Sequence, residues 1–275
     1  MKYFLDTEFH EYHKQPKVCG IKIGKTISTI DLISIGIVND GKELSALTKM
    51  CGPYGNNSYI GKELLKGTTE REYYAVCKDF NIKDAWNANQ GTKEKPNYWL
   101  RENVLRPIYF ELLKLDGDTY NNIYTKELGK YEYKIFKRLI NKYGKTKEQI
   151  AEEIKEFVGV SKDLEEAERI YSKNKTLITK KWEDIVDILK PEFYAYYADY
   201  DWVVFCQLFG KMIDLPTGFP MYCKDLKQSL DENWGFKSDY KKARLHPNYP
   251  KQENEHNALD DAKWNKKLYN FLNTL

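Results

Sequence analysis

Residues 29–38 restrict the fold of this chain more than any other segment. The run TIDLISIGIV is rich in β-branched side chains, and the turn-forming sequence Asn-Asp-Gly follows it. Such side chains pack well on a pleated surface, so the run predicts a β-strand that ends in a tight turn. Between this strand and the N-terminal one, residues 10–28 are polar and predict a loop. The other strands are expected at 3–6, 72–77 and 193–197.

Helical patterns are concentrated in the later part of the chain. Residues 99–113 have apolar residues at helical spacing, and Pro107 predicts a kink in that helix. Thr146 and Gln149 have the spacing of a capping box at a helix start. Because strands come first and helices are interspersed later, we expect an α/β fold with a mixed sheet. Further helices are expected at 120–143, 147–158, 201–209, 226–230 and 258–272.

The composition is that of a soluble globular protein. Its 41% hydrophobic content argues against disorder, and no apolar run approaches the roughly 20 residues needed to span a bilayer. Asp6 interrupts the apolar start, so the N-terminus does not resemble a signal peptide. Five cysteines without a C-x-x-C pair fit reduced thiols. We expect a cytoplasmic protein without a membrane segment.

Two carboxylates stand at the end of the first predicted strand. Asp6 and Glu8 are two residues apart, so their side chains leave the same face of the strand. Like charges this close repel each other unless a cation lies between them, and hard ions such as Mg²⁺ or Mn²⁺ prefer oxygen ligands. A pair of solvated acids at an exposed strand end is the simpler interpretation of these two residues alone.

Two later segments supply further polar groups. Asp201 follows the aromatic strand and could be a metal ligand or only a helix N-cap, with Asp199 as a competitor. His256 precedes Asp260 and Asp261 near the start of the last helix. Five residues of ideal helix would place His256 and Asp261 about 140° apart. They can therefore meet only if His256 lies before the helix and folds back.

Together these segments resemble the DEDDh 3′–5′ exonucleases of the ribonuclease H-like superfamily. The closest resemblance is to the bacterial and phage 3′–5′ exoribonucleases related to ribonuclease AS. It implies one exonuclease domain over residues 1–275, with a ribonuclease H-like mixed central sheet flanked by helices. The segments that carry it are YFLDTEF (3–9), IDLISIG (30–36), YYAV (73–76), YDWVVFCQLFG (200–210) and HNALDDA (256–262). Insertions are expected at about 10–28, 42–70, 115–142 and 161–190.

The resemblance also selects the functional residues. It implies Asp6, Glu8, Asp201 and Asp261 as ligands of two Mg²⁺ or Mn²⁺ ions about 4 Å apart, and His256 as the general base. Asp6 would bridge the ions, and Glu8 and Asp261 would hold the one that carries the attacking water. Asp201 would complete the coordination of the second. The implied reaction releases nucleoside 5′-monophosphates from the 3′ ends of RNA, single-stranded or overhanging.

Several residues are candidates for holding the substrate. Phe9 is next to Glu8 and could stack under the terminal base, with Thr7 beside it and Trp202 packing on the same nucleotide. Both aromatics could instead be core residues, which for Trp202 is the simpler interpretation. Lys241, Lys242 and Arg244 precede His256 and are candidates for phosphate contacts.

A second basic segment is harder to assign. Lys126, Lys130, Lys134, Arg138 and Lys142 recur every four residues, which predicts one stripe along a helix. The stripe could contact RNA or be an ordinary solvated face. The total charge of +3 does not reveal such local concentrations.

Other functions remain open at this level. The same motifs would serve an exonuclease on single-stranded DNA, since ribose recognition depends on local geometry. A catalytically silent nucleic-acid-binding module of the same fold is the alternative from another class. His10, His13 and Cys19 could begin a zinc site, although no fourth ligand follows. Relatives in the resembled group are commonly dimers, so a homodimer is possible.

Overall fold

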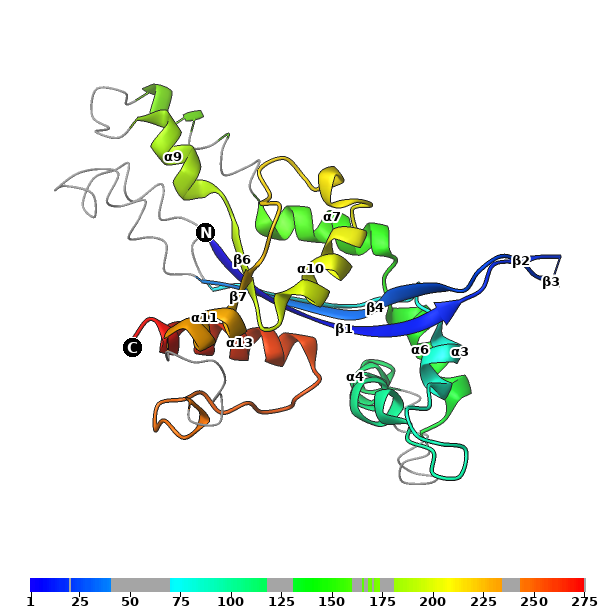
Figure 1. The fold of residues 1–275 in the computed structure, drawn as a ribbon. Coiled ribbons are helices and arrows are strands. Elements are labelled where there is room, and N and C mark those ends of the chain that lie inside the picture. The colour runs from blue at the N-terminus through cyan, green and yellow to red at the C-terminus, as the bar shows by residue number, and fades with distance from the viewer. Residues whose placement is uncertain are drawn as a thin grey trace.

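A mixed five-stranded sheet forms the centre of the computed structural model (Figure 1). The strands lie in the order β5-β4-β1-β6-β7; β4 runs antiparallel to β1 and β5, whereas β6 and β7 run parallel to β1. This α/β arrangement is consistent with the expected ribonuclease H-like mixed sheet. The strands are β1 (Lys2–Lys14), β4 (Ile27–Asn39), β5 (Glu72–Val76), β6 (Glu192–Ala195) and β7 (Lys224–Asp225). The structure describes residues 1–19, 21–40, 70–117, 131–159, 165, 168, 169, 171–173, 181–233 and 243–274.

The long hairpin of β1 and β4 corrects the expected strands. Their register runs from Tyr3 opposite Asn39 to Lys14 opposite Ile27, and β2 (Lys17–Val18) and β3 (Ile21–Lys22) pair at its tip. The tip projects beyond the helices (Figure 1). The prediction of a loop over 10–28 was therefore wrong for most of that segment. Cross-strand pairing satisfies the backbone of this polar stretch, and the sequence of one strand alone does not reveal it.

Helices cover both faces of the sheet (Figure 1). Leu5 and Ile35 of one face pack with α7 and α10, whereas Phe4 and Tyr194 of the opposite face pack with α11 and α13. Farther along that second face, Ile33 packs with α3, α4 and α6. The helices are α3 (Ile82–Asn87), α4 (Arg106–Leu115), α6 (Tyr133–Tyr143), α7 (Lys147–Val158), α9 (Trp182–Leu189), α10 (Ala198–Gln207), α11 (Leu226–Asn233) and α13 (Ala258–Leu272). None of the helices in the described ranges is both long and apolar enough to cross a membrane.

Local helix signals have mixed outcomes. The capping box is confirmed, because Thr146 accepts from the backbone of Gln149 and the Gln149 side chain accepts in return. The kink expected at Pro107 takes the form of a π-helical turn, Arg101–Leu105, which passes directly into α4. Proline suits this place because the first turn of an α-helix does not need its N–H.

Two residues of the basic stripe make a structural contact. Arg138 and Lys142 both bind Asp116, at 3.1 and 2.6 Å, and the Asp116 side chain is nearly buried. This pairing joins α6 to the end of α4. Lys126 and Lys130 lie outside the described residues, so an RNA-contacting role for the stripe stays a prediction.

The N-terminus of α13 comes very close to β4 at Gly36. A Cβ atom at this glycine would lie 2.2 Å from the carbonyl oxygen of Ala258, which is backbone and cannot rotate away. Farther along α13, the buried Asn265 side chain donates to the carbonyl oxygen of Leu5 at 2.9 Å. These two contacts set the position of α13 over β1 and β4.

We predict that Gly36→Ala destabilises the protein by about 2–3 kcal/mol, because the added methyl group must push α13 away from the sheet. Urea unfolding followed by circular dichroism measures this. Gly117→Ala is the control, since nothing lies within 4 Å of the position its Cβ would take. Equal stability of the two variants would contradict the prediction.

Candidate active site

The free edge of β1 lies beside a cleft of about 350 Å³. β6 pairs with residues 2–4 of β1, and within the described ranges no other strand pairs with that edge from Leu5 onward. Both faces of the strand therefore contribute to the cleft. Its lining is Asp6, Thr7, Glu8, Phe9, Tyr196, Tyr197, Tyr200, Asp201, Arg244, Gln252, Glu255, His256, Asp261, Trp264 and Asn265.

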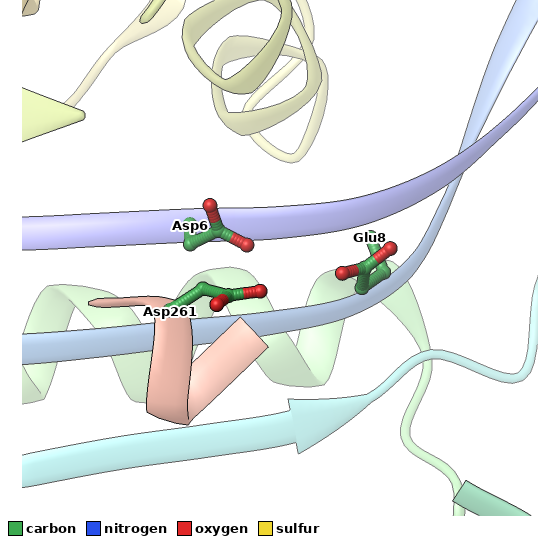
Figure 2. A group of neighbouring side chains, drawn as sticks. All are labelled: Asp6, Glu8 and Asp261. Atoms are coloured by element: carbon green, nitrogen blue, oxygen red, sulfur yellow. The ribbon is translucent and has the colours of Figure 1, made fainter. Parts of the chain in front are cut away.

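Three carboxylates gather on the α13 side of β1. One oxygen each from Asp6, Glu8 and Asp261 lies within 4.8 Å of the others (Figure 2). Asp6 and Glu8 alternate with Thr7 along β1 and so share a face, as expected, while Asp261 comes from the first turn of α13. Among the described residues, no lysine or arginine pairs with these three side chains.

Burial and mutual repulsion disfavour the charged forms of these groups. Burial, followed by the charges of Asp261 and Asp201, raises the pKa of Glu8 to about 8. Burial is also the main reason why the pKa of Asp6 lies well above its usual value. Among the residues that the structure describes, the charged forms of these three carboxylates have no paired lysine or arginine. A hard divalent cation would supply the positive charge and prefers oxygen ligands, so this set of side chains fits such an ion.

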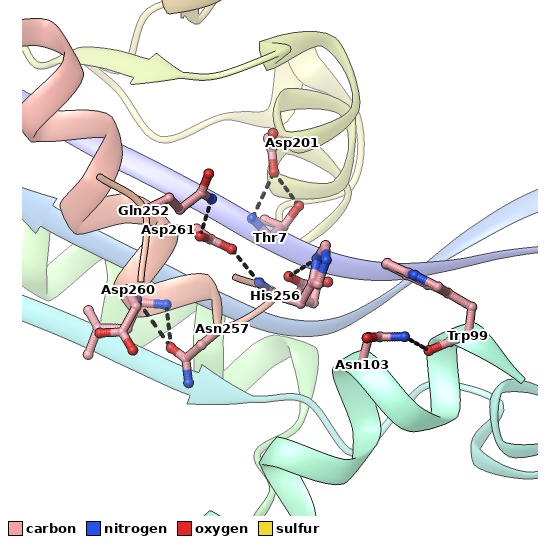
Figure 3. A network of polar contacts seen from close by, with 11 residues as sticks. Thr7, Trp99, Asn103, Asp201, Gln252, His256, Asn257, Asp260 and Asp261 are labelled. Atoms are coloured by element: carbon pink, nitrogen blue, oxygen red, sulfur yellow. Dashed lines mark hydrogen bonds and ion pairs between the residues drawn. The ribbon is translucent and has the colours of Figure 1, made fainter. Parts of the chain in front are cut away.

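Asp201 reaches the cleft from the opposite face of β1. The backbone N–H and the hydroxyl of Thr7 both donate to its Oδ1 at 2.7 Å, although the two residues are 194 apart in the chain (Figure 3). Burial raises the pKa of Asp201 to about 7, and the hydrogen bonds from Thr7 oppose that rise. Thr7 also lines the cleft, so the expected substrate contact stays a prediction, and its two hydrogen bonds hold Asp201 in place.

Asp199 and Asp201 both lie in the first turn of α10, but only Asp201 lines the cleft. α10 begins at Ala198 with Tyr197 as its N-cap, so the interpretation of Asp201 as an N-cap was wrong. Asp201 is buried and lines the cleft, whereas Asp199 is exposed and lies outside it. Asp201 is therefore the better placed of the two for a cation.

His256 lies before α13 and folds back, as its spacing from Asp261 required. Its φ is 71°, its backbone N–H donates to Asp261 Oδ2 at 2.9 Å, and its Nδ1 is 3.9 Å from Glu8 Oε1 (Figure 3). The neighbouring Asp260 accepts from Asn254 and does not join the carboxylate group. The structure thus brings His256 next to Glu8 and Asp261.

Two residues that sequence reasoning missed support this arrangement. The Trp99 ring packs edge-on against the His256 ring, with a centroid distance of 4.7 Å, and the Gln252 side chain donates to Asp261 Oδ1 at 2.6 Å (Figure 3). Neither lies within a recognisable motif. Only the position of the helical turn that leads into Arg101–Leu105 brings Trp99 to the site, and only the path of the loop before α13 brings Gln252 there.

The aromatic candidates have different positions. Phe9 lines the cleft and stacks on Tyr200, with centroids 5.5 Å apart and planes at 10°. Trp202 does not line the cleft: it is 8% exposed, stacks on Phe205 and donates from its indole N–H to the carbonyl oxygen of Met221. The expected substrate contact of Trp202 is therefore corrected to a core role. Tyr200, the residue directly before Asp201, is exposed and lines the cleft, where Trp202 had been expected.

The remaining candidates are divided. Arg244 lines the cleft, whereas Lys241 and Lys242 lie outside the described residues. The hypothetical zinc ligands do not come together, because His10 is buried against Asp84 and Cys19 is exposed near the hairpin tip. Within the part of the chain that is described, the group of Asp6, Glu8 and Asp261 is the metal-compatible one.

Comparison with known proteins adds no family assignment. No protein-family model matches the sequence, and no curated protein matches it.

We predict that, without divalent cations, the protein becomes less stable as the pH rises from about 5 to about 8. A carboxyl group whose pKa is raised on folding stabilises the folded state while protonated, and this contribution is lost as the pH passes through the folded-state value. For Glu8 that window runs from its ordinary value of 4.5 to about 8. Melting temperatures in EDTA across this range measure the effect, and added Mn²⁺ should reverse it.

The Glu8→Gln variant should show a flatter dependence than the wild type. Glu94→Gln, at an exposed loop position, is the matched control and should leave the dependence unchanged. Superimposable curves for wild type and Glu8→Gln would contradict the prediction.

Proposed function

We propose that this protein is a metal-dependent 3′–5′ exoribonuclease of the DEDDh type. The observation that carries the proposal is the gathering of Asp6, Glu8 and Asp261 within 4.8 Å, in a cleft that also holds His256. Partly or fully buried carboxylates with raised pKa values, next to a histidine, are typical of a functional site, because removing their charges from water is otherwise unfavourable.

Asp6, Glu8 and Asp261 would hold Mg²⁺ or Mn²⁺, and Asp201 on the opposite face of β1 would complete a site for two ions. When bound, such ions generate a water nucleophile and stabilise the leaving oxygen of a phosphodiester. The hydrogen bonds of Asp201 to Thr7 and of Asp261 to Gln252 and His256 fix the orientation of these two carboxylates before any ion arrives.

His256 would accept the proton of the attacking water. Its Nδ1 faces Glu8, so Nε2 is the nitrogen left for this proton. The edge-on contact with Trp99 restricts rotation of the His256 ring. The backbone N–H of His256 donates to Asp261, which keeps the histidine next to one of the proposed cation ligands. The products would be a nucleoside 5′-monophosphate and a strand shortened at its 3′ end.

Aromatic rings at the cleft favour an unpaired substrate. Phe9 and Tyr200 form a stacked pair beside Glu8, and stacking on such rings holds the bases of single strands. Arg244 adds a cation to a cleft otherwise rich in carboxylates. The choice of RNA over DNA and the homodimer rest on the resemblance, the cytoplasmic location rests on the composition and the N-terminal sequence, and all three stay predictions.

The function is tested with labelled strands. Single-stranded RNA and its DNA equivalent, each labelled at the 3′ end, are incubated with the protein in Mg²⁺, in Mn²⁺ and in EDTA. We expect release of labelled mononucleotide from RNA with either metal and none in EDTA. Asp261→Asn should abolish release, whereas Asp260→Asn, the adjacent acid outside the carboxylate group, should retain it. No release by the wild type, or equal activity of the two variants, would refute the proposal.

We predict that His256→Ala lowers turnover about 10²- to 10⁴-fold while Mn²⁺ affinity changes little, because the side chain moves a proton and does not hold the ion. Initial rates and calorimetric Mn²⁺ titration measure the two properties separately. His13→Ala, at an exposed position of the hairpin, is the control. Near-normal turnover of His256→Ala would remove this histidine from the mechanism.

A further inference from the structure

A second groove, of about 420 Å³, adjoins the cleft on the α10 side of the sheet. Glu11 and Ile30 contribute from the hairpin, and they are direct cross-strand partners. From α10, Asp199, Val203 and Gln207 follow one another at intervals of four residues and so share one helix face. The groove lies where β1 and β4 extend past α10, and two of its lining residues, Glu11 and Ser28, belong to the segment that the sequence predicted to be a loop.

Tyr200 connects the groove to the cleft. It lines both, and its ring is stacked on Phe9, which lines the cleft. A single strand with its 3′ end at the carboxylates would therefore meet the groove directly beyond this aromatic pair. Together with Ile30 and Val203, the Tyr200 ring offers an apolar wall suited to a planar base.

The polar groups of the groove favour a base over a phosphate. Glu11 and Asp199 are exposed carboxylates, and Gln207 is an amide; none of the three side chains has a hydrogen-bond partner among the residues described. Two negative charges repel phosphate, whereas a carboxylate readily accepts a hydrogen bond from the exocyclic amino group of a base. Cytosine and adenine carry such a donor at the edge where uracil and thymine carry a carbonyl acceptor.

We propose that this groove binds an unpaired base with an exocyclic amino group, in the nucleotide that precedes the 3′-terminal one. The position along the strand rests on the proposed exonuclease function. The chemistry of base recognition rests on the groove alone, so the two can be tested separately.

Nucleoside binding tests the groove without catalysis. Cytidine and uridine are uncharged, so their binding can be measured by NMR titration in EDTA, where hydrolysis does not occur. We expect cytidine to bind about tenfold more tightly than uridine, as for one hydrogen bond to a charged group. The double variant Glu11→Gln/Asp199→Asn should lose this preference, because amides are weaker acceptors and can donate to the carbonyl of uracil.

Filling the groove provides an independent variant. Val203 is about half exposed, so Val203→Trp should block the groove without disturbing the core, and cytidine binding should be lost. Val18→Trp, at a similarly exposed valine near the hairpin tip, is the matched control, and Glu94→Gln controls for the loss of charge. Melting temperatures establish that each variant is folded.

The outcomes separate the groove from the proposed function. Equal binding of cytidine and uridine, or a preference unchanged in both groove variants, overturns the groove proposal even if the wild type hydrolyses RNA. A cytidine preference that the groove variants remove supports it even if no mononucleotide is released, in which case the exonuclease function fails. With both present, RNA with cytosine before the terminal nucleotide should be hydrolysed faster than RNA with uracil there, and Val203→Trp should remove the difference.

Discussion

The contact between the start of α13 and the β1–β4 hairpin is the constraint on which the site depends. Gly36 has no side chain, so the Ala258 carbonyl can lie directly against β4, and Asn265 anchors the same helix to the backbone of Leu5. This approach brings Asp261 opposite Asp6 and Glu8. A larger residue at position 36 would push the start of α13 away from β4. Asp261 would then move away from Asp6 and Glu8, although the new side chain touches none of the three.

The same geometry makes the site unfavourable for stability when no cation is bound. Asp6 and Glu8 are partly buried, Asp201 is buried, and the three lie near one another; their raised pKa values reflect the free energy needed to charge them. Hydrogen bonds from Thr7 offset part of this for Asp201. The arrangement is understandable if a divalent cation normally supplies the missing positive charge, which links the stability of the fold to its proposed chemistry.

Much of the site was predictable because it depends on short-range spacing. The period of two along a strand put Asp6 and Glu8 on one face, and the spacing of five positions from His256 to Asp261 required His256 to precede the helix; both are confirmed. The interpretation of Asp201 as an N-cap was wrong because α10 begins three residues earlier, at Ala198. Trp202 was misplaced for a related reason: the sequence does not show which face of α10 the core covers.

The sequence by itself determined the central parts of β1, β4, β5 and β6, the capping box and the pairing of Asp6 with Glu8, since each follows from residues that are near one another in the chain. Tertiary structure alone decided that Asp201 binds Thr7 across 194 residues, that Trp99 contacts His256, and that the hairpin forms a groove with α10. These contacts depend on how whole elements pack. Packing is settled by the summed burial of both faces of the sheet, and no local spacing records it.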